Sequence, residues 1–439
     1  MSDHRGRSSR SGPVHDPEAP GLCLLTETYH PVIGGGETQA RELAQRLVER
    51  NWRVAVFAWR SDPTTARRAL DGGVLVRRVP PSGAGRHRKW SLVLTTLPAL
   101  LGLRRRYDLI LVSGFRLLGI PALVCARLLG KRCVLKADSL GEMSGEYFAA
   151  GLAKIRLSVS SPPFRLFLAL RNRLFRSAGA FVAVTSEIAA ELARSGVDPD
   201  SVHRIPNGVD TERFHPVSPQ RKRELRTQLD LPAERTIVTY VGRLVSYKGL
   251  PTLLEAWRSL AARRSDGLLV LAGAGGFDIH ACEGELRELV RRHRLEEQVR
   301  FAGEVREVTP LLQTSDAFVL PSENEAFGLA LVEAMSCGLP AVSTAVGGLR
   351  DIARDDENAL VVPPRDAQAL EAALQRLLSQ PQLRERLGRA ARETAVSCFS
   401  LERVAELYER LACALLGLGD APRLVAAAEP DRRRGSSPP

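Results

Sequence analysis

Short apolar runs rich in β-branched residues alternate with amphipathic helical stretches along most of the chain, and the series occurs twice. This rhythm is typical of parallel βαβ units, because a parallel strand needs a long crossover, usually a helix, before the next strand can pair with it. We therefore predict an α/β protein with two doubly wound parallel sheets. The expected strands cover residues 22–26, 53–59, 74–79, 109–112, 132–135, 180–184 and 203–205 in the first series, and 236–241, 268–272, 299–301, 317–320 and 340–343 in the second.

The boundary between the two series is expected at residues 214–219, where Pro216 and Pro219 disfavour helix and no apolar periodicity continues. Both ends of the chain are rich in Ser, Arg and Pro, which favours disorder over packing. The predicted segments are a disordered tail (1–20), an N-terminal domain (21–215), a C-terminal domain (216–398), a C-terminal helix (399–418) and a second disordered tail (419–439).

The positive charge of the chain is unevenly distributed. The formal net charge is +12, yet residues 1–220 contain 32 basic and 19 acidic side chains, whereas residues 221–439 contain 30 and 31. Between Arg41 and Arg176 there are 26 basic and 8 acidic residues. Codon bias toward arginine could supply much of the total, since only six of the basic residues are Lys, but it would not place the excess in one half. The asymmetry indicates an anionic partner: nucleic acid, an acidic membrane or a charged substrate.

Several classes of protein are disfavoured by the composition. The longest run without Asp, Glu, Lys or Arg, residues 334–349, contains Gly, Pro and Ser and is shorter than the roughly 20 apolar residues that span a bilayer. Residues 1–20 lack the apolar core of a signal peptide, so a cytoplasmic location is expected. The seven Cys and eight His form no ligand cluster, and Asp355-Asp356 is interpreted as a loop. We therefore expect reduced thiols and no metal.

Gly34-Gly35-Gly36 follows the first expected strand and opens a helix that should run to about Arg50. Glycines allow the backbone to approach a ligand closely, and a helix N-terminus presents N–H groups to a phosphate. The motif is not GxGxxG and no acidic residue ends the second strand, so a dinucleotide is disfavoured. A simple tight turn is an equal alternative.

Arg243 and Lys248 follow the strand that opens the second series. Ligands of open α/β sheets bind at the carboxyl ends of strands, and these two cations suit a diphosphate because Arg offers a planar fork and Lys a point charge. The alternative is a solvated loop.

Glu325 and Glu333 follow the strand at residues 317–320, the first in a loop and the second on the next helix. Carboxylates accept hydrogen bonds from the hydroxyl groups of ribose and other sugars. Phe327, Gly328 and Leu329 form the start of that helix, where backbone N–H groups can bind phosphate. An ordinary solvated helix face is the alternative, which the apolar neighbours of Glu333 disfavour.

Taken in order, these motifs resemble the family 4 glycosyltransferases, which are retaining enzymes of the GT-B fold with nucleotide-sugar donors. The resemblance covers about residues 22–415 and implies two Rossmann-like domains facing a central cleft, with the last helix returning toward the N-terminal domain. It rests on Gly34-Gly35-x-Glu37, Pro206-Asn207-Gly208-Val209-Asp210, Gly242-Arg243-x4-Lys248-Gly249, Leu271-Ala272-Gly273-x-Gly275, and Glu325-x7-Glu333 continuing through Ala334-Met335 to Gly338 and Pro340.

The resemblance also implies roles for these residues. Arg243 and Lys248 would neutralise the donor diphosphate, Glu333 would bind the ribose hydroxyls and Glu325 would lie against the donor sugar. The remaining implied donor-binding residues are Gly34, Gly35, Gly273, Gly275, Phe327, Gly328 and Leu329. The donor would be a UDP or GDP sugar, with no cofactor, no metal and no enzyme nucleophile.

The chain departs from the family at one position. Many members carry a His just after the strand equivalent to residues 132–135, where it contacts the donor sugar, but here Asp138 and Ser139 follow Lys136 and Ala137. Asp138, which we include among the catalytic candidates, or Ser139 could bond a sugar hydroxyl instead. The alternative is a catalytically degenerate GT-B protein that binds a nucleotide sugar or a glycan. An inverting enzyme is a nearer rival.

The positive half is expected to face the acceptor, as the resemblance implies. Residues 92–103 are apolar, with Arg86, Arg88 and Lys89 before them and three arginines after, and residues 164–176 form a basic amphipathic helix. Such helices can lie in a membrane interface, although a solvated helix covering the sheet is an equal alternative. We expect a peripheral enzyme at the inner face of the plasma membrane, acting on a lipid-linked or anionic cell-envelope glycan precursor. Nucleic acid is disfavoured, because no binding motif is present and aromatic residues are only 5%.

Overall fold

The computed structural model describes residues 19–32, 34–80, 82–83, 88–153, 156–276 and 280–419, without the side chains of residues 88–90 and 150. The two predicted tails lie outside the described residues except for Ala19, Pro20 and Gly419, and so does Arg86. The chain divides into two units. The first contains the described residues up to 183, 191–203 and those from 405 onward, and the second contains residues 184–190 and 204–404.

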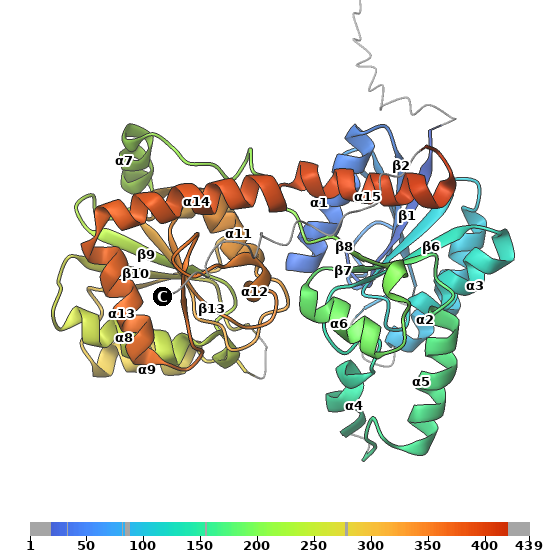
Figure 1. Ribbon diagram of the computed structural model, residues 1–439, viewed down its shortest axis with the longest axis horizontal. Helices are drawn as coiled ribbons and strands as arrows, with labels where there is room; N and C mark the ends of the chain where they lie inside the picture. The colour runs from blue at the N-terminus through green and yellow to red at the C-terminus, as the bar shows by residue number, and fades with distance from the viewer. Residues whose placement is uncertain are drawn as a thin grey trace, which may run out of the picture. The chain divides into compact units, whose positions relative to one another are not determined.

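The first unit is built on an eight-stranded sheet. Its strands are β1 (Gly21–Leu25), β2 (Arg53–Trp59), β3 (Arg68–Asp71), β4 (Val74–Val79), β5 (Leu109–Ser113), β6 (Arg132–Ala137), β7 (Ala180–Ala183) and β8 (Val202–Arg204). Their order is β3-β4-β2-β1-β5-β6-β7-β8. Figure 1 labels β1, β2, β6, β7 and β8 of this sheet. β1 pairs in parallel with β2 on one side and with β5 on the other. The strand order therefore reverses between β1 and β5. Open α/β sheets bind ligands at such a reversal.

Helices of the first unit connect these strands. They are α1 (Gly35–Glu49), α2 (Arg88–Gly102), α3 (Gly119–Leu129), η1 (Glu146–Phe148), α4 (Ala149–Ala153), α5 (Pro162–Phe175), α6 (Ser186–Arg194) and η2 (Pro199–Ser201), of which α6 lies across the boundary between the units. α1 starts at Gly35 and ends at Glu49, in agreement with the predicted helix after the glycine triplet.

The second unit is built on a six-stranded parallel sheet. Its strands are β9 (Thr236–Val241), β10 (Gly267–Ala272), β11 (Val299–Gly303), β12 (Ala317–Leu320), β13 (Ala341–Thr344) and β14 (Leu360–Val362). They lie in the order β11-β10-β9-β12-β13-β14, and every adjacent pair is parallel. The strand order reverses between β9 and β12, so this is the ligand-binding edge expected for the second sheet.

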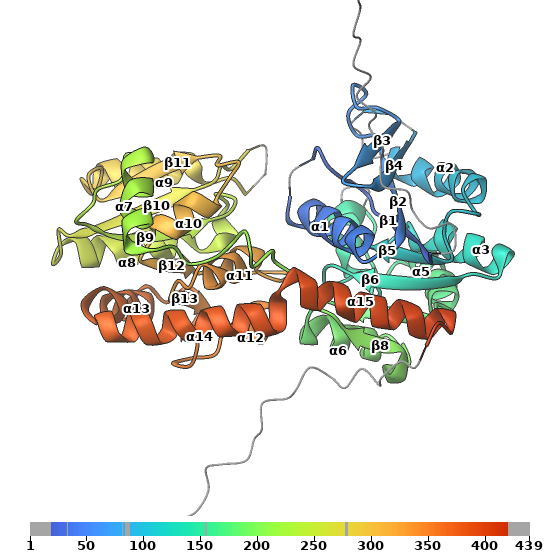
Figure 2. The same ribbon diagram turned by 90° about the horizontal axis from the view of Figure 1, so that it is seen from above.

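The helices of the second unit follow the doubly wound pattern. They are α7 (Pro219–Gln228), η3 (Ser246–Lys248), α8 (Leu250–Ala261), α9 (Glu283–Arg292), α10 (Thr309–Thr314), α11 (Leu329–Ser336), α12 (Leu349–Ile352), α13 (Ala367–Ser379) and α14 (Pro381–Phe399). A last helix, α15 (Leu401–Leu416), follows α14 after the single residue Ser400 and belongs from Ala405 onward to the first unit. Figures 1 and 2 both show α14 along the second unit and α15 along the first.

α15 buries Tyr408 and Leu411 and is also bound to the first unit through one carboxylate. Glu409 accepts hydrogen bonds from the Nε of Arg50, at 2.8 Å, and from the indole Nε1 of Trp52, at 3.1 Å. Both donors follow α1 directly, and Trp52 is among the largest fully buried side chains. Charge-assisted hydrogen bonds of this kind fix both the position of the helix along its axis and the face that it turns toward the sheet.

Each predicted strand overlaps an observed one, and the structure adds β3 and β14. β3 pairs antiparallel with β4, so the first sheet carries one antiparallel edge strand beyond the predicted parallel pattern. The turn between them contains Gly72 and Gly73, with φ of 55° and 84°. Asp-Gly-Gly is a known hairpin signal, because such turns need two residues at positive φ. β14 has only three residues, too few to produce a recognisable pattern.

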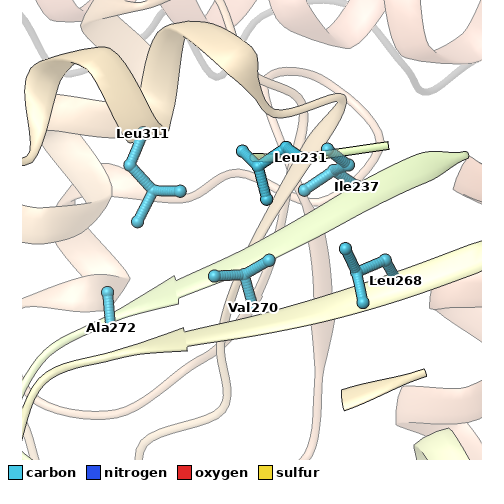
Figure 3. Packing of buried hydrophobic residues seen from close by; sticks show 6 residues of the cluster. All are labelled: Leu231, Ile237, Leu268, Val270, Ala272 and Leu311. Carbon is cyan, nitrogen blue, oxygen red and sulfur yellow. The ribbon is translucent and has the colours of Figure 1, made fainter. Parts of the chain in front are cut away.

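A buried apolar cluster fills the space between the second sheet and α10 (Figure 3). Ile237 on β9, Leu268 and Val270 on β10 and Leu311 on α10 are all at most 6% exposed. None of the helices in the described ranges combines the length and the hydropathy that a membrane-spanning helix needs.

We predict that Ile237→Ala lowers the free energy of unfolding by roughly 2–5 kcal/mol, because it removes buried methylene and methyl groups and leaves a cavity. Urea denaturation followed by tryptophan fluorescence measures the loss. Val396→Ala is the control in the same unit, since this side chain is 41% exposed on α14 and its truncation should be nearly neutral. Equal effects of the two substitutions would contradict the placement of Ile237 in a tightly packed core.

Candidate functional site

The loops at the carboxyl ends of three neighbouring strands of the second sheet, β10, β9 and β12, contact each other closely. Gly249, after η3, has φ of 71°, and a Cβ there would lie 1.9 Å from the carbonyl oxygen of Pro321. Gly273, after β10, has φ of 140°, and a Cβ would lie 1.9 Å from the carbonyl oxygen of Gly242. Only glycine permits both the conformation and the approach at these two positions. The β9 loop is therefore packed between the β10 and β12 loops, which brings the predicted donor-binding motifs to one edge.

An ion pair joins the β9 and β12 loops across the point where the strand order reverses. The Nζ of Lys248 lies 2.5 Å from Oε2 of Glu325, and the hydroxyl of Ser322 donates to the same oxygen at 3.3 Å. The Lys248 and Glu325 side chains are 13% and 14% exposed. Because desolvated charges attract strongly, the pair holds the two loops in one geometry. The sequence motifs placed these residues at the same edge but did not predict that they contact each other.

Arg243 lies on the same loop as Lys248, at the exposed side of the site. Its Nη2 donates to the hydroxyl of Tyr247 at 2.5 Å, and its guanidinium carbon is 5.8 Å from the centre of that ring. The Nζ of Lys248 is also 5.8 Å from the Tyr247 ring centre. The hydroxyl of Tyr240 donates to the carbonyl of Arg243 at 2.8 Å and so supports the loop backbone. Tyr247 was not a sequence candidate, because a tyrosine in a loop carries no pattern of its own.

Glu333 lies on α11 and is partly buried, so it does not belong to a solvated helix face. Burial raises the pKa of Glu333 to about 7; the positive charge of Arg213 acts in the opposite direction and the negative charge of Glu307 adds to the rise. Arg213 offers only limited compensation, because its Nη2 also binds both carboxylate oxygens of Glu307, at 2.9 and 2.8 Å. Near neutral pH, Glu333 is therefore a mixture of its protonated and ionised forms.

The N-terminus of α11 has no side-chain cap. Gly328 is the N-cap residue, with φ of 109°, and α11 begins at Leu329. Phe327 is buried and its ring packs edge-on against Phe399, with the centroids 5.9 Å apart. The segment 327–329 is thus anchored by an aromatic side chain while the helix start keeps the positive end of its dipole uncapped by a side chain.

The loop after β10 contains the other two predicted glycines of this unit. The N–H of Gly273 donates to the carbonyl of Gly303 at 2.7 Å, and a Cβ at Gly275 would lie 2.8 Å from the Cβ of Ala281. This loop therefore packs against its neighbours through its backbone. Residues 277–279 lie outside the described part of the chain.

Three predicted site residues belong to the first unit. Gly34 is the N-cap of α1 with an extended φ of −177°, and a Cβ there would lie 2.4 Å from Oε2 of Glu37. Gly35 is the first residue of α1. Glu37 accepts a hydrogen bond from the hydroxyl of Thr28, in the loop after β1. A Cβ at position 34 would therefore meet only the far end of the flexible Glu37 side chain, so neither packing nor the backbone dihedral demands glycine there.

Asp138, the third, follows β6 directly and is bound on both sides. Its Oδ1 pairs with the Nζ of Lys136, which is only 4% exposed, and its Oδ2 accepts a 2.5 Å hydrogen bond from the hydroxyl of Ser113. Ser113 ends the neighbouring strand β5. Lys136 and Ser113 were missed by the sequence reasoning, although both lie where predicted strands end, which is the signal that could have identified them.

The candidate residues therefore form two groups. Asp138, Gly34 and Gly35 lie at the carboxyl edge of the first sheet, and the other nine lie in the second unit. Within the described ranges no group of His, Cys, Asp and Glu could hold a metal ion. In the Asp355-Asp356 segment, Asp356 forms ion pairs with Arg376 at 3.3 Å and Arg386 at 3.0 Å. Asp356 therefore contributes to a network of ion pairs.

Comparison with known proteins gives consistent matches over both units. A family model described as "Glycosyl transferases group 1" matches residues 221–394, and one described as "Glycosyltransferase Family 4" matches residues 33–213. The chain is 30% identical over 380 residues to a D-inositol 3-phosphate glycosyltransferase from Saccharomonospora viridis, covering 82% of this chain and 85% of that protein.

Two solved structures illustrate the fold. Sucrose-phosphate synthase from Thermosynechococcus elongatus is 26% identical with a TM-score of 0.74, covering 91% of this chain and 100% of that one. HepE from Anabaena, in complex with UDP and glucose, is 20% identical with a TM-score of 0.70, covering 89% and 99%. The first and second sheets together therefore correspond to the GT-B fold.

We predict that Glu333→Gln changes how stability depends on pH. The folded-state pKa of Glu333 is about 7, above its ordinary value of 4.5, so the folded protein binds the proton more tightly than the unfolded chain in this range. Its contribution to the free energy of unfolding should therefore decrease as pH rises from about 4.5 to about 7. Denaturation curves across this range should show that decrease in the wild type and a smaller one in the Gln variant. Glu385→Gln, at a side chain 72% exposed, is the control and should leave the slope unchanged.

Proposed function

The chain belongs to glycosyltransferase family 4, and on this premise we propose that it transfers a sugar, with retention of configuration, from a UDP or GDP sugar to a hydroxyl group of a lipid-linked or anionic cell-envelope glycan precursor. The observation that carries the proposal is the ion pair of Lys248 and Glu325 at the β9–β12 switch point, with Arg243 on the same loop as Lys248 and Glu333 on the helix that follows Glu325. Two cations and two carboxylates at this edge match the diphosphate and the diols of a nucleotide sugar.

The cations account for the departure of the diphosphate. Negative charge grows on the leaving phosphate as the bond between sugar C1 and oxygen breaks, and fixed positive groups stabilise that charge without reorganising. Lys248 has three N–H donors, so Glu325 and a diphosphate oxygen can share it. Glu325 then aligns Lys248 as well as lying against the sugar, and Arg243 offers a second, bidentate contact.

The carboxylate and backbone groups account for the rest of the donor. Glu333, when ionised, accepts the two ribose hydroxyls, and the start of α11 directs its positive end toward phosphate. In front-face transfer, a leaving phosphate oxygen takes the acceptor's proton while the acceptor oxygen bonds to C1 on the same face. This route needs no nucleophile from the enzyme and no metal.

The acceptor proposal rests on the first unit. The S. viridis relative is named for an inositol 3-phosphate acceptor, a polyol that carries phosphate, and HepE is described with UDP and glucose. An anionic acceptor fits the segment from Arg41 to Arg176, which contains 26 basic and 8 acidic residues. The second candidate, a degenerate GT-B binding protein, is favoured by Asp138 in place of the usual His.

Exposed apolar side chains support membrane association of the first unit. Of the eleven large hydrophobic side chains exposed in the described residues, all but Leu229 and Val396 lie there. On α5, Phe164, Leu168 and Phe175 are buried, whereas the opposite face carries Leu166 and Leu170, each 62% exposed, beside exposed Arg165 and Arg173. Leucines between arginines suit the interface of an anionic membrane, where acyl chains cover the leucines and headgroups bind the arginines.

We predict that Lys248→Ala lowers kcat by about 100- to 1000-fold, because it removes one stabilising donor from the leaving group. Thermal-shift measurements with UDP, GDP and their sugars identify the donor, and product analysis gives kcat and the anomer formed. Lys222→Ala is a matched control: Lys222 forms a 2.7 Å ion pair with Asp316, which precedes β12 at the opposite end of the sheet, so stability should decrease but not kcat. Nucleotide binding without turnover of any donor by the wild type would favour the degenerate binding protein.

We also predict that the wild type binds vesicles containing anionic lipid more strongly than neutral vesicles. Replacing Leu166 and Leu170 together with Ser should weaken this binding by about tenfold or more, because two apolar side chains are lost from the interface. Flotation measures the bound fraction, and Leu229→Ser, at an exposed leucine of the second unit, is the control. Equal failure of the wild type to bind anionic and neutral vesicles would remove the membrane proposal and leave the transfer reaction untouched.

A further inference from the structure

The loop after β6, residues 138–144, is held by three buried charged side chains. Glu142, Arg171 and Glu191 are 0%, 3% and 7% exposed. Glu191, on α6, accepts the N–H of Gly141 at 2.8 Å and that of Ser144 at 3.1 Å. Arg171, on α5, donates through Nη2 to the carbonyl of Glu142 at 3.0 Å and to that of Met143 at 2.8 Å. Side-chain charges therefore define the path of this loop, together with the backbone hydrogen bonds that the carbonyl of Gly141 accepts from Gly145 and Tyr147.

Glu142 binds the beginning of its own loop. Its Oε1 accepts the N–H of Asp138 at 3.0 Å, the N–H of Ser139 at 3.2 Å and the hydroxyl of Ser139 at 3.3 Å. The guanidinium of Arg116, in the loop after β5, lies 3.6 Å from the same oxygen. One buried carboxylate oxygen thus fixes the peptide plane between Asp138 and Ser139.

This peptide carries the residue that stands in the place of the family's histidine. The Asp138 side chain contacts Lys136 and Ser113 only if its backbone keeps the present orientation, because a side chain this short cannot compensate for a rotated peptide. Hydrogen bonds from amides to a carboxylate are roughly twice as strong as those to a neutral acceptor, so the charge on Glu142 sets the rigidity of the arrangement.

We propose that Glu142 is a positioning residue of the transfer reaction: its carboxylate holds the Asp138–Ser139 peptide and thereby fixes the Asp138 carboxylate at the sugar-binding edge of the first sheet. The inference rests on the proposed function for its catalytic consequence. The hydrogen bonds from Glu142 to this peptide, which we call the clamp, rest on the geometry and are testable without turnover.

The surroundings of Glu142 make this clamp sensitive to pH. Burial raises the pKa of Glu142 to about 7; the positive charge of Arg116 opposes the rise and the negative charge of Asp138 increases it. The clamp is therefore expected to weaken below neutral pH, as Glu142 takes up a proton. The titratable and charged groups around it come from several elements: Glu27 after β1, Arg116 after β5, Asp138 in the same loop, Tyr147 on η1, Arg171 on α5 and Glu191 on α6.

The test compares Glu142→Gln with Glu191→Gln, which holds the same loop but does not touch Asp138 or Ser139. In the wild type, kcat should fall on the acid side of about pH 7. Glu142→Gln should lower kcat at about pH 8 by roughly tenfold and leave KM for the donor within about twofold. It should also remove the decrease in kcat below about pH 7, the acid limb of the pH profile. Glu191→Gln should keep the limb. Arg116→Gln, which retains Glu142 but removes its cationic partner, should move the limb to higher pH.

Hydrogen exchange of the Asp138 and Ser139 amides provides a readout that does not depend on activity. After correction for the intrinsic rate, protection should decrease between about pH 8 and pH 6 in the wild type but not in Glu142→Gln. If protection behaves in this way but no donor is turned over, the proposed function fails and the clamp stands. If Glu142→Gln and Glu191→Gln alter stability alike, and the pH profile of kcat and the protection remain as in the wild type, the positioning role is overturned.

Discussion

The ion pair between Lys248 and Glu325 joins two loops that are 77 residues apart in the chain, and the candidate donor site depends on it. The pair lies between β9 and β12, where the order of the second sheet reverses and the crossover helices diverge. Because the divergence leaves this edge open, side chains there can bind a ligand without breaking strand pairing. Gly249 makes the geometry achievable, since its missing Cβ lets the β9 loop rest on the carbonyl of Pro321. Backbone contact supplies the close approach, and the buried charges fix which side chains face each other.

The first sheet uses the same principle with a different set of charges. Asp138 is held by Lys136 from its own strand and by Ser113 from the adjacent strand, and its peptide is held by Glu142. Buried ionisable groups cost free energy unless they are paired, so a loop stabilised in this way is rigid only while its charges persist. The two sheets therefore present polar groups by similar means: the second presents an exposed cation, Arg243, and the first presents a carboxylate, Asp138.

Charge and apolar exposure point to different tasks for the two units. The second unit, nearly neutral as a whole, concentrates a few charges at one edge. The first carries the basic excess together with most of the exposed leucines, such as Leu166 and Leu170 on α5. A diffuse positive surface attracts anionic partners over a distance of about a Debye length, whereas a local pair of cations recognises one phosphate group. This division supports a donor side and an acceptor side within one family 4 glycosyltransferase.

The sequence by itself determined the two parallel sheets, nearly all their strands and the loops in which the chemistry lies, because strand length, apolar runs and glycine positions are local properties of the chain. It did not indicate β14, which is too short to show a pattern, and the antiparallel β3 was signalled only by its Asp-Gly-Gly turn. Only the tertiary structure showed that Lys248 binds Glu325, that Arg243 donates to the hydroxyl of Tyr247, and that Glu142 turns back onto Asp138. These contacts join strands distant in sequence or depend on rotamers fixed by packing, and burial, which moves the pKa of Glu142 and Glu333 to about 7, exists only in the folded chain.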